Sequence, residues 1–403
     1  MGAPIPVTDA IAKVRAGALT PQPEDIKLAK ALGRVLAVPV IATRDQPPFN
    51  ASAMDGYAVQ RDSLKAGAGL KIIGESTAGR RFSGQVGAGE AVRIFTGAPV
   101  PADCDAILIQ ENTRPADGGI DILPDGLKVE QGHIRHRGQD FKTGDTLLDA
   151  GLRLDPWRLS LVAAAGLPAV SVARRPRIAV LSTGDELVLP GESPNTDQIY
   201  ESGSHAVMAL IKQWGGKPAY LGARGDSEKA ILKAFKGLKA DMIVTIGGAS
   251  VGDYDLVKPA LVKLGLKLDF DGVKVRPGKP SSFGRLDTGT RVLGLPGNPA
   301  SAFVVAQLLL KPWIEASLGL PARDPVIQAA LLKPLAANGS RETYLRAVLT
   351  CSDNGQMQVS AFDDQDSSLM SVFARAGGLI RLPAGAKAMT AGQVVDVLPL
   401  DRL

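Results

Sequence analysis

The stretch RIAVLSTGDE, residues 177–186, decides the fold class that we predict for this chain of 403 residues. An apolar run of strand length ends there in Gly184 and two carboxylates, and a segment with the apolar spacing of a helix follows it. The same order returns in the segments that begin with KPAYLG, DMIVTI and RVLGL. Apolar strands that alternate with helices pair in parallel. We therefore predict a doubly wound parallel α/β domain over residues 176–322.

The regions on either side of this domain have a different texture. In residues 46–154 and 323–403, short apolar runs are divided by glycine, proline and aspartate, which is typical of β-rich domains. For the second of these regions we predict a small β-barrel or sandwich.

Two segments that flank the first of these β-rich regions have apolar residues at helical spacing. EDIKLAKALGRVLA, residues 24–37, predicts a helix that ends before Pro39. DPWRLSLVAAAGL, residues 155–167, predicts a helix capped by Asp155 with Pro156 in its first position. We group these segments in one α+β N-terminal domain. The predicted domains are therefore 1–45 with 155–175, 46–154, 176–322 and 323–403.

Composition and charge exclude several classes of protein. The net charge is +5 without a run of five like charges, and 4% of the residues are aromatic, which fits an anionic substrate better than nucleic acid. Cys104 and Cys351 are too few and too far apart for a disulfide framework or a Cys-rich zinc site, which suits a reducing compartment. Neither a segment of membrane-span length nor a secretory signal is apparent. We expect a cytoplasmic protein that binds no nucleic acid and no membrane.

The ends of the four predicted parallel strands are the expected place for a site, because ligands of open α/β sheets bind beyond the carboxyl ends of the strands. Each of these ends carries glycine or polar residues. They are Thr183, Gly184, Asp185 and Glu186; Asp226; Gly247, Gly248, Ser250, Gly252, Asp253 and Asp255; and Pro296, Gly297 and Asn298.

These residue types suit a ligand that carries phosphate. Gly247 and Gly248 let backbone amides approach an anion without interference from a Cβ atom. Arg276 and Lys279, in RPGKPSSFG, can bind phosphate or another oxyanion. A divalent cation that bridges phosphates can bind carboxylates. The candidate carboxylates are Asp185, Glu186, Asp226, Asp253 and Asp255.

Several of these residues also have a purely structural interpretation. Asp226 can cap the helix that follows it, and Asp185 with Glu186 can be charges in the first turn of a helix. Gly297 can shape a turn before a helix. The convergence of four loops favours a site over these alternatives. The three histidines are scattered, and neither a Ser-His-Asp constellation nor a dinucleotide or P-loop motif is present at the strand ends.

A second candidate carboxylate lies in SAMDGYAV, residues 52–59. Asp55-Gly56 is a common hairpin turn, because glycine accepts positive φ and aspartate bonds to its own backbone. The residues alone leave two interpretations open, a structural turn or a carboxylate presented for chemistry.

Six motifs in order carry a resemblance to a known family. They are SAMDGYAV, TGDEL, QIYESGSHAVMAL, GGASVGDYDLVK, RPGKPSSFG and LPGNPASAFV, and ETYLRA with SSLMSVFARAGGLIRLP follow them. With these motifs the whole chain resembles the molybdopterin molybdenumtransferase family (MoeA, related to the C-terminal part of gephyrin). The resemblance implies insertion of molybdate into adenylylated molybdopterin with release of AMP. It also implies a molybdopterin-binding type of α/β domain, an elongated N-terminal domain, and a homodimer whose composite sites combine the α/β domain with the partner's MDGYA domain.

The resemblance further implies roles for individual residues. Asp55 would act in molybdate insertion or adenylate cleavage, with Thr96 lining the site. The other catalytic residues, which would bind the pterin-adenylate or a metal, would be Glu186, Asp226 and Asp255. Mg²⁺ is the implied cofactor, with Asp55, Glu186 and Asp226 as its ligands. Arg276 and Lys279 would hold oxyanions, and Arg346 and Ser367 would add contacts from the tail domain.

Two positions depart from the family pattern. Gly203 stands where the family commonly has asparagine, and Asp366 where it commonly has glycine beside Ser367. The alternatives that we weigh are a molybdopterin adenylyltransferase of the same pathway, a tungstate-handling paralogue and a non-enzymatic scaffold like gephyrin. Molybdopterin adenylyltransferase and proteins that mature molybdoenzymes are the implied partners besides a second copy of the chain.

Overall fold

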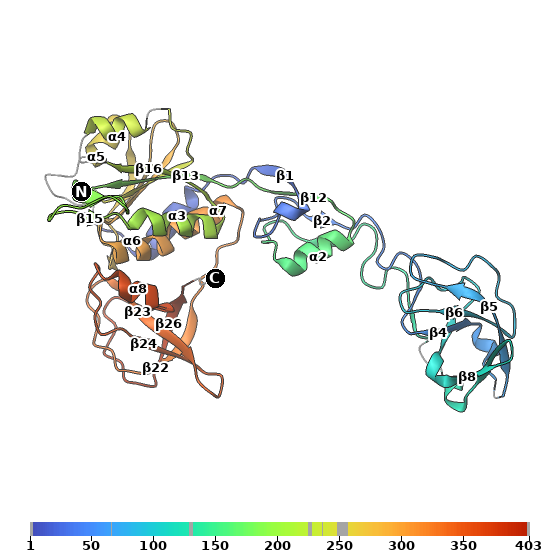
Figure 1. Ribbon diagram of the computed structural model, residues 1–403. Coiled ribbons are helices and arrows are strands. Elements are labelled where there is room, and N and C mark those ends of the chain that lie inside the picture. Colours follow the sequence, from blue (N-terminus) through green and yellow to red (C-terminus); the bar gives the residue numbers. More distant parts are fainter. Residues whose placement is uncertain are drawn as a thin grey trace. The chain divides into compact units, whose positions relative to one another are not determined.

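The computed structural model describes residues 3–65, 67–128, 132–224, 228–235, 237–247 and 257–400. The chain forms two compact units. Unit 1 comprises Met1–Glu24 and Ala173–Leu403, and unit 2 comprises Asp25–Val172. Figure 1 shows the elements of both units. Among the described residues, no helix combines the length and the apolar character needed to cross a membrane.

The centre of unit 1 is a six-stranded sheet. Its order is β16 (Lys217–Arg224), β13 (Arg177–Thr183), β17 (Met242–Ile246), β21 (Arg291–Leu295), β20 (Ser282–Arg285) and β18 (Lys267–Asp271). The first four strands are parallel, as predicted. Strand β20 pairs antiparallel with both β21 and β18, and these two edge strands were not predicted. Six of the seven residues of β13 are buried, because helices cover both faces of the sheet.

Helices pack on both faces of this sheet (Figure 1). On one face, α4 (Glu228–Phe235) and α5 (Val257–Lys263) share a core with β13, β17 and β21. On the other lie α3 (Gly203–Trp214), α6 (Pro299–Val305) and α7 (Lys311–Ser317). A π-helical turn over Ala306–Leu310 joins the last two into one continuous helix. The doubly wound prediction is confirmed.

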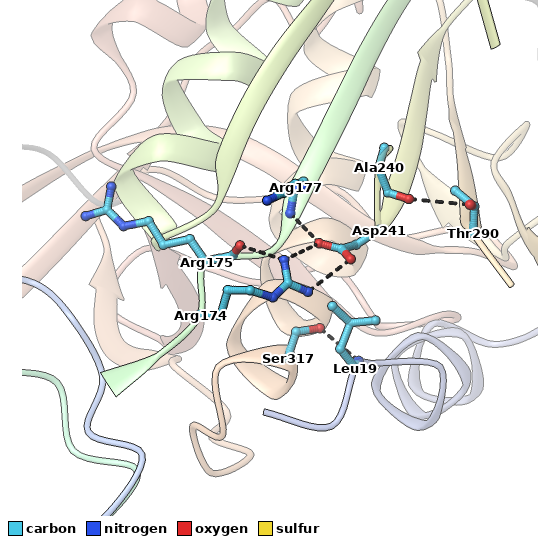
Figure 2. A network of polar contacts seen from close by, with 8 residues as sticks. All are labelled: Leu19, Arg174, Arg175, Arg177, Ala240, Asp241, Thr290 and Ser317. Atoms are coloured by element: carbon cyan, nitrogen blue, oxygen red, sulfur yellow. Dashed lines mark hydrogen bonds and ion pairs between the residues drawn. The ribbon is translucent and has the colours of Figure 1, made fainter. Parts of the chain in front are cut away.

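At the amino ends of the strands, the carboxylate of Asp241 accepts several hydrogen bonds (Figure 2). Asp241 accepts bonds from Arg174 through both oxygens, at 3.0 and 3.1 Å, and from the backbone N–H of Arg177 at 2.6 Å. Arg174 belongs to the segment that enters β13 from unit 2. This bidentate pair therefore fastens that segment to the start of β17.

The first residues of the chain pack on unit 1. Helix α1 (Val7–Ala16) buries Val7, Ala10 and Val14, and the buried indole of Trp313 in α7 donates to the carbonyl of Gly17 at 3.0 Å. Residues 3–24 belong to unit 1, where α7 covers the apolar face of α1. The grouping of residues 1–45 with 155–175, like the rest of the four-domain division, stays a prediction.

The C-terminal region forms a closed five-stranded barrel, which agrees with the prediction of a small barrel. Strand β23 (Glu342–Cys351) pairs with both β24 and β25, which closes the ring. The other strands are β22 (Ile327–Leu331), β24 (Met357–Ala361), β25 (Gly378–Leu382) and β26 (Val394–Pro399). Strand β19 (Val275–Arg276), from the loop before β20, extends the barrel sheet by pairing with β23. Helix α8 (Met370–Arg375) packs against α6, with Phe373 edge-on to Phe303.

Unit 2 contains the predicted β-rich domain. Its six-stranded sheet has the order β7 (Ala106–Ile109), β4 (Gly56–Val59), β6 (Glu90–Ile94), β5 (Gly69–Ser76), β9 (Gly119–Ile122) and β8 (Thr113–Ala116). Short pairs join β2 (Val40–Ile41) to β11 (Thr146–Leu148) and β3 (Ala51–Ser52) to β10 (Ile134–Arg135). Single 3₁₀ turns cover Arg61–Ser63, Gln110–Asn112 and Pro124–Leu127.

The two helices predicted around this domain have different outcomes. Helix α2 (Pro156–Ala164) begins as predicted, with the Asp155 carboxylate accepting from the N–H of Arg158 at 2.8 Å and proline in the first turn. The helix predicted over 24–37 is wrong. Strand β1 (Pro23–Lys27) pairs there with β12 (Ala169–Ala173), and one 3₁₀ turn over Leu28–Lys30 follows.

Asp55 and Gly56 do not form a hairpin turn. The bend covers residues 53–55, and Gly56 is already the first residue of β4, paired with Ile94 and Ile109 on its two sides. Gly56 is absent from the positive-φ residues of the chain. Glycine is required there for another reason, because a Cβ atom would lie 2.1 Å from the carbonyl oxygen of Leu108.

We predict that Gly56→Ala destabilises unit 2. The added methyl group meets backbone that cannot move without breaking the β4–β7 pairing, and overpacking of this kind costs about 1–3 kcal/mol. Gly69→Ala is the matched control, since Gly69 is the first residue of β5 and a Cβ there has no neighbour closer than 3.8 Å. Urea denaturation followed by circular dichroism should show a lower midpoint for Gly56→Ala only. Equal midpoints for the two variants would contradict this account.

Candidate functional site

The structure brings the ends of three parallel strands together at one edge of the unit 1 sheet. Gly247, after β17, donates its N–H to the carbonyl of Leu295 at 3.2 Å. A Cβ atom on Gly247 would lie 2.7 Å from the carbonyl oxygen of Thr183, and one on Gly297 would lie 3.6 Å from Gly247 Cα. The three backbones approach closely because two of them carry glycine. This edge is the one at which the sequence places the strand-end loops, and their role in binding a ligand stays a prediction.

Thr183 is the last residue of β13 at this edge. It is 6% exposed, and its hydroxyl has no hydrogen-bond partner among the described residues. A buried hydroxyl without a partner is uncommon, and an ordered water, an ion, local strain or a functional role can account for it.

The turn after β13 carries two of the predicted carboxylates. Asp185 and Glu186 are exposed and lead into a short strand, β14 (Leu187–Val188), rather than into a helix. The interpretation of these residues as charges in a first helical turn is therefore wrong. The Glu186 carboxylate lies over Gly184, where a Cβ atom would be 2.4 Å from it. Strand β14 pairs with β15 (Ile199–Tyr200), which precedes α3.

Part of the predicted set lies outside the described residues. These residues are Asp226, Gly248, Ser250, Gly252, Asp253 and Asp255. Within the described parts of the chain, no group of three or more acidic, histidine or cysteine side chains is arranged to hold a metal ion. The Mg²⁺ ligand set of Asp55, Glu186 and Asp226 thus stays a prediction.

The predicted oxyanion residues lie on a loop that packs against α6. Arg276 and Lys279 are both exposed. The carbonyl of Lys279 accepts from the N–H groups of Val273 and Ser281, at 3.0 and 2.9 Å, which fixes the course of the backbone. Gly278 adopts φ +116° with its Cα against α6, where a Cβ would lie 2.4 Å from Val305 Cγ2. The backbone of this loop is thereby fixed beside α6.

A barrel loop meets the α/β domain at the start of α6. The Asn298 side chain donates to the Ser367 hydroxyl at 2.8 Å, and the N–H of Ala300 donates to the Ser367 carbonyl at 3.1 Å. Pro296 is buried, and Pro299 occupies the first position of the helix. Ser367 therefore caps α6 from another domain, and two residues predicted from separate motifs are in contact.

Arg346 holds this barrel loop in place. Its side chain is 1% exposed and donates to the Gln365 side chain at 3.2 Å and to the Asp366 carbonyl at 2.9 Å. Burial lowers the pKa of its guanidinium below the ordinary value. The third guanidinium nitrogen, Nη2, has no partner among the described residues. Arg346 was predicted to bind substrate, and in this structure its observed contacts support the loop that presents Ser367.

The two departures from the family pattern are accommodated locally. The Asp366 carboxylate accepts from the hydroxyl and the N–H of Ser368, and these bonds lower its pKa. It therefore faces its own loop. Gly203 is the first residue of α3, and a Cβ there would lie 3.3 Å from Ile246 Cγ2, so that a side chain needs only a small shift of Ile246.

In unit 2, the Asp55 carboxylate is held by the loop after β6. Its Oδ1 accepts from the N–H and the hydroxyl of Thr96, at 2.7 and 2.8 Å. These two bonds, with a smaller contribution from the positive charge of Arg93, lower the pKa of Asp55. Oδ2 receives no hydrogen bond from the described residues. One carboxylate oxygen is fixed and the other is available to a ligand.

Arg93 is a residue of this site that sequence analysis missed. Its guanidinium lies 5.0 Å from the ring centre of Tyr57 and 4.9 Å from that of Phe95, and it donates to the Gly56 carbonyl at 3.1 Å. The N–H of Gln110 donates to the Asp55 carbonyl at 3.1 Å. The carbonyl groups of Asp55 and of Gly56 are thus both held by hydrogen bonds. In the sequence only Phe95 stands near Arg93, two positions after it, whereas Tyr57 comes from the neighbouring strand β4.

Glu201, in QIYESGS, is a second missed residue. It is 2% exposed and accepts bonds from Ser182 and Ser204. An acidic residue three positions before a serine at a helix start was the sequence signal, and it predicts a cap. Its burial beside β13 was not visible from sequence.

Comparison with known proteins covers almost the whole chain. The MoeA N-terminal region (domains I and II) matches residues 5–166, a probable molybdopterin binding domain matches 179–316, and the MoeA C-terminal region (domain IV) matches 328–400. The molybdopterin molybdenumtransferase of Haemophilus influenzae is 34% identical over 95% of each chain. That of a Nostoc species is 35% identical over 94% of this chain and 88% of its own.

The fold agrees with a solved structure. The molybdopterin biosynthesis moea protein from Pyrococcus horikosii superposes with a TM-score of 0.84 at 28% identity, covering 99% of this chain and 100% of its own. Matches to all three regions of the family in the expected order, with relatives above 30% identity over nearly the full length, show the family. This chain belongs to the MoeA family of molybdopterin molybdenumtransferases.

Proposed function

We propose that this protein acts in molybdenum cofactor biosynthesis as a transferase that inserts molybdate into adenylylated molybdopterin and releases AMP. The observation that carries the proposal is the close approach of Thr183, Gly247 and Gly297 at the edge of a probable molybdopterin binding domain. Such an edge offers backbone groups to a phosphate-bearing ligand at the position where ligands of open α/β sheets bind. The MoeA-type regions on both sides distinguish the chain from a lone α/β domain.

The cationic loop beside α6 supplies the countercharge for this substrate. Arg276 and Lys279 are exposed on a loop whose backbone is fixed by hydrogen bonds and by the packing of Gly278. A cation on a rigid support binds an oxyanion at a smaller cost in conformational entropy than one on a mobile segment. We assign the anionic groups of the substrates, phosphate or molybdate, to this loop.

Asp55 is assigned to the chemical step. A carboxylate repels molybdate unless a cation or a proton lies between them. Thr96 fixes Oδ1, and Oδ2 is left for a Mg²⁺ ion, whose preferred ligands are carboxylate oxygens, or for a proton. A bound Mg²⁺ would neutralise part of the anionic charge of the substrates. Glu186 and Asp226 are the other proposed ligands.

We further propose that the active protein is a homodimer with shared sites. Asp55 belongs to unit 2 and the strand-end loops belong to unit 1. In the proposed arrangement, Asp55 of one protomer serves the sheet edge of its partner. The proposed location is the cytoplasm, and both cysteines are free thiols, which suits a reducing compartment. A molybdopterin adenylyltransferase that supplies the substrate and maturation proteins that accept the product are the proposed further partners.

Three alternative functions have less support. A molybdopterin adenylyltransferase of the same pathway would need only the α/β domain, whereas this chain also matches the N- and C-terminal regions of MoeA. A scaffold like gephyrin would have no use for a carboxylate held as Asp55 is. A preference for tungstate remains an outcome of the activity test, in which either oxyanion can be offered.

The first prediction for this function concerns Asp55→Asn. The variant should keep its affinity for adenylylated molybdopterin within about twofold, because the glycine edge of unit 1 is unchanged, and it should lose molybdate insertion and AMP release by about 100-fold or more, the usual loss when a positioned acid–base group is removed. Calorimetry measures the affinity, and chromatography of AMP measures the turnover. Asp62→Asn, at an exposed aspartate of the same unit, is the control that should retain activity.

The two roles of Asp55 give different responses in the same assay. If Asp55 holds Mg²⁺, raised Mg²⁺ should restore part of the lost rate. If it takes up a proton, the variant should show an altered pH profile and no rescue. A variant that binds adenylate weakly but turns over normally at saturation would refute both roles.

The second prediction is that Lys279→Ala weakens the binding of molybdate or adenylate by about 1–3 kcal/mol, the range for a charged hydrogen bond. Lys274→Ala is a matched control, because Lys274 is exposed on the same segment and its backbone bond to Ile5 survives the substitution. Isothermal titration with each ligand should separate the two variants. Unchanged affinities in folded Lys279→Ala would remove this residue from the site.

The third prediction tests the shared site. An Asp55→Asn protomer mixed with a Glu186→Gln protomer should regain activity after subunit exchange, because one intact site forms in each heterodimer. Light scattering should report a dimer. A mixture that stays as inactive as its parents, while exchange is verified by mass spectrometry, would exclude composite sites.

A further inference from the structure

The buried carboxylate of Glu201 has contacts on two different elements. Its Oε1 accepts from the hydroxyl of Ser182 at 2.9 Å and from the N–H of Ser204 at 2.7 Å, and its Oε2 accepts from the hydroxyl of Ser204. Ser182 is the residue before the last of β13, and Ser204 lies in the first turn of α3. The carboxylate thus joins the end of a central strand to the start of a helix.

The backbone of Glu201 adds a contact on the far side of the turn after β13. Its N–H donates to the carbonyl of Val188 at 2.8 Å, and that of Ile199 donates to the carbonyl of Glu186 at 2.8 Å. Ser182 precedes the turn that carries Asp185 and Glu186, and Val188 follows it. Glu201 therefore holds both ends of this turn. Its side chain accepts from Ser182, before the turn, and its backbone N–H donates to Val188, after it.

Helix capping accounts for only part of this arrangement. The bond from the N–H of Ser204 is an ordinary cap, and serine, threonine or asparagine would supply it at a smaller cost in desolvation. The bond from Ser182 does not involve the helix at all. A carboxylate that is 2% exposed accepts all three bonds, whereas in an amide the nitrogen accepts none and the two bonds to the remaining oxygen lose the strength that an ionised acceptor gives them.

We propose that Glu201 is a positioning residue that holds the Gly184–Glu186 turn in the geometry required by the transferase reaction. It acts through Glu186 and does not touch the substrate. This inference rests on the proposed function, because Glu186 matters to the reaction only if the sheet edge binds the pterin-adenylate.

Hydrogen exchange measured by mass spectrometry tests the structural half of the proposal. In Glu201→Gln, the amides of residues 184–188 should exchange about tenfold faster than in the wild type, while the barrel strands keep their rates. Glu192→Gln is the matched control, since Glu192 is an exposed carboxylate of the same region that accepts one bond, from the N–H of Leu189. Unchanged exchange at 184–188, or a uniform rise over the whole chain, would overturn the proposal.

Ser182→Ala is the second variant, for the case that Glu201→Gln does not fold. It removes the bond to β13 and leaves the cap of α3 intact. The same local rise in exchange at residues 184–188 is expected. A rise confined to α3 in either variant would reduce Glu201 to a helix cap and overturn the proposal.

A double-mutant cycle tests the functional half. Glu201→Gln alone should lower kcat about tenfold with the KM for adenylylated molybdopterin changed by less than about threefold. In a Glu186→Gln background the same change should cost less than about twofold, because the residue through which Glu201 acts is already lost. Independent, multiplicative losses would refute action through Glu186. A wild-type protein without turnover would instead refute the proposed function, and the exchange rates alone would then decide whether Glu201 holds the turn.

Discussion

The carboxylate of Asp241 sets the register on which the α/β sheet and its site depend. It accepts from Arg174 and from the N–H of Arg177, while its own backbone pairs with the carbonyl of Arg177 at 2.8 Å and with the N–H of Arg291 at 3.0 Å. In the three neighbouring strands β13, β17 and β21, Met242 pairs with Ile178 on one side and with Arg291 on the other, so that the strands start level. A slip of one residue would turn every side chain to the other face and shift a strand end by about 3.3 Å.

The level start explains why the strand ends coincide at the opposite edge. Strands of similar length that begin together also finish together, and so Thr183, Gly247 and the residues after Leu295 meet within van der Waals distance. The barrel adds to this edge through two attachments, the pairing of β19 with β23 and the contact of Ser367 with Asn298. A site built on strand ends is held more precisely than one on free loops.

The sequence was most informative where one interaction type dominates. The apolar run of β13 fits only a strand covered on both faces, and Asp155 with Pro156 is a strong helix start, so these elements were predicted correctly. The segment 24–37 has helical spacing, yet its backbone pairs with β12, a partner about 145 residues away that no local pattern reveals. Long-range pairing overrides propensity in such cases.

The same distinction holds for the candidate site. The strand-end loops were predicted from topology, and the proposed roles of Asp55 and Ser367 rest on a family resemblance. The need for glycine at position 56 comes from a carbonyl about 50 residues away, and the burial of Glu201 comes from three separate segments. Contacts of this kind depend on tertiary structure, and a single sequence does not record them.

The bond between Trp313 and Gly17 links residues 296 positions apart, and this separation has a consequence for synthesis of the chain. Helix α1 leaves the ribosome long before α7 exists, so its apolar face has no partner for most of translation. Unit 2 is continuous in sequence and can fold during that interval, since domains fold as units from the N-terminal side. Unit 1 closes last, around a helix that was made first, and the nascent chain must keep that helix from aggregating until its partner emerges.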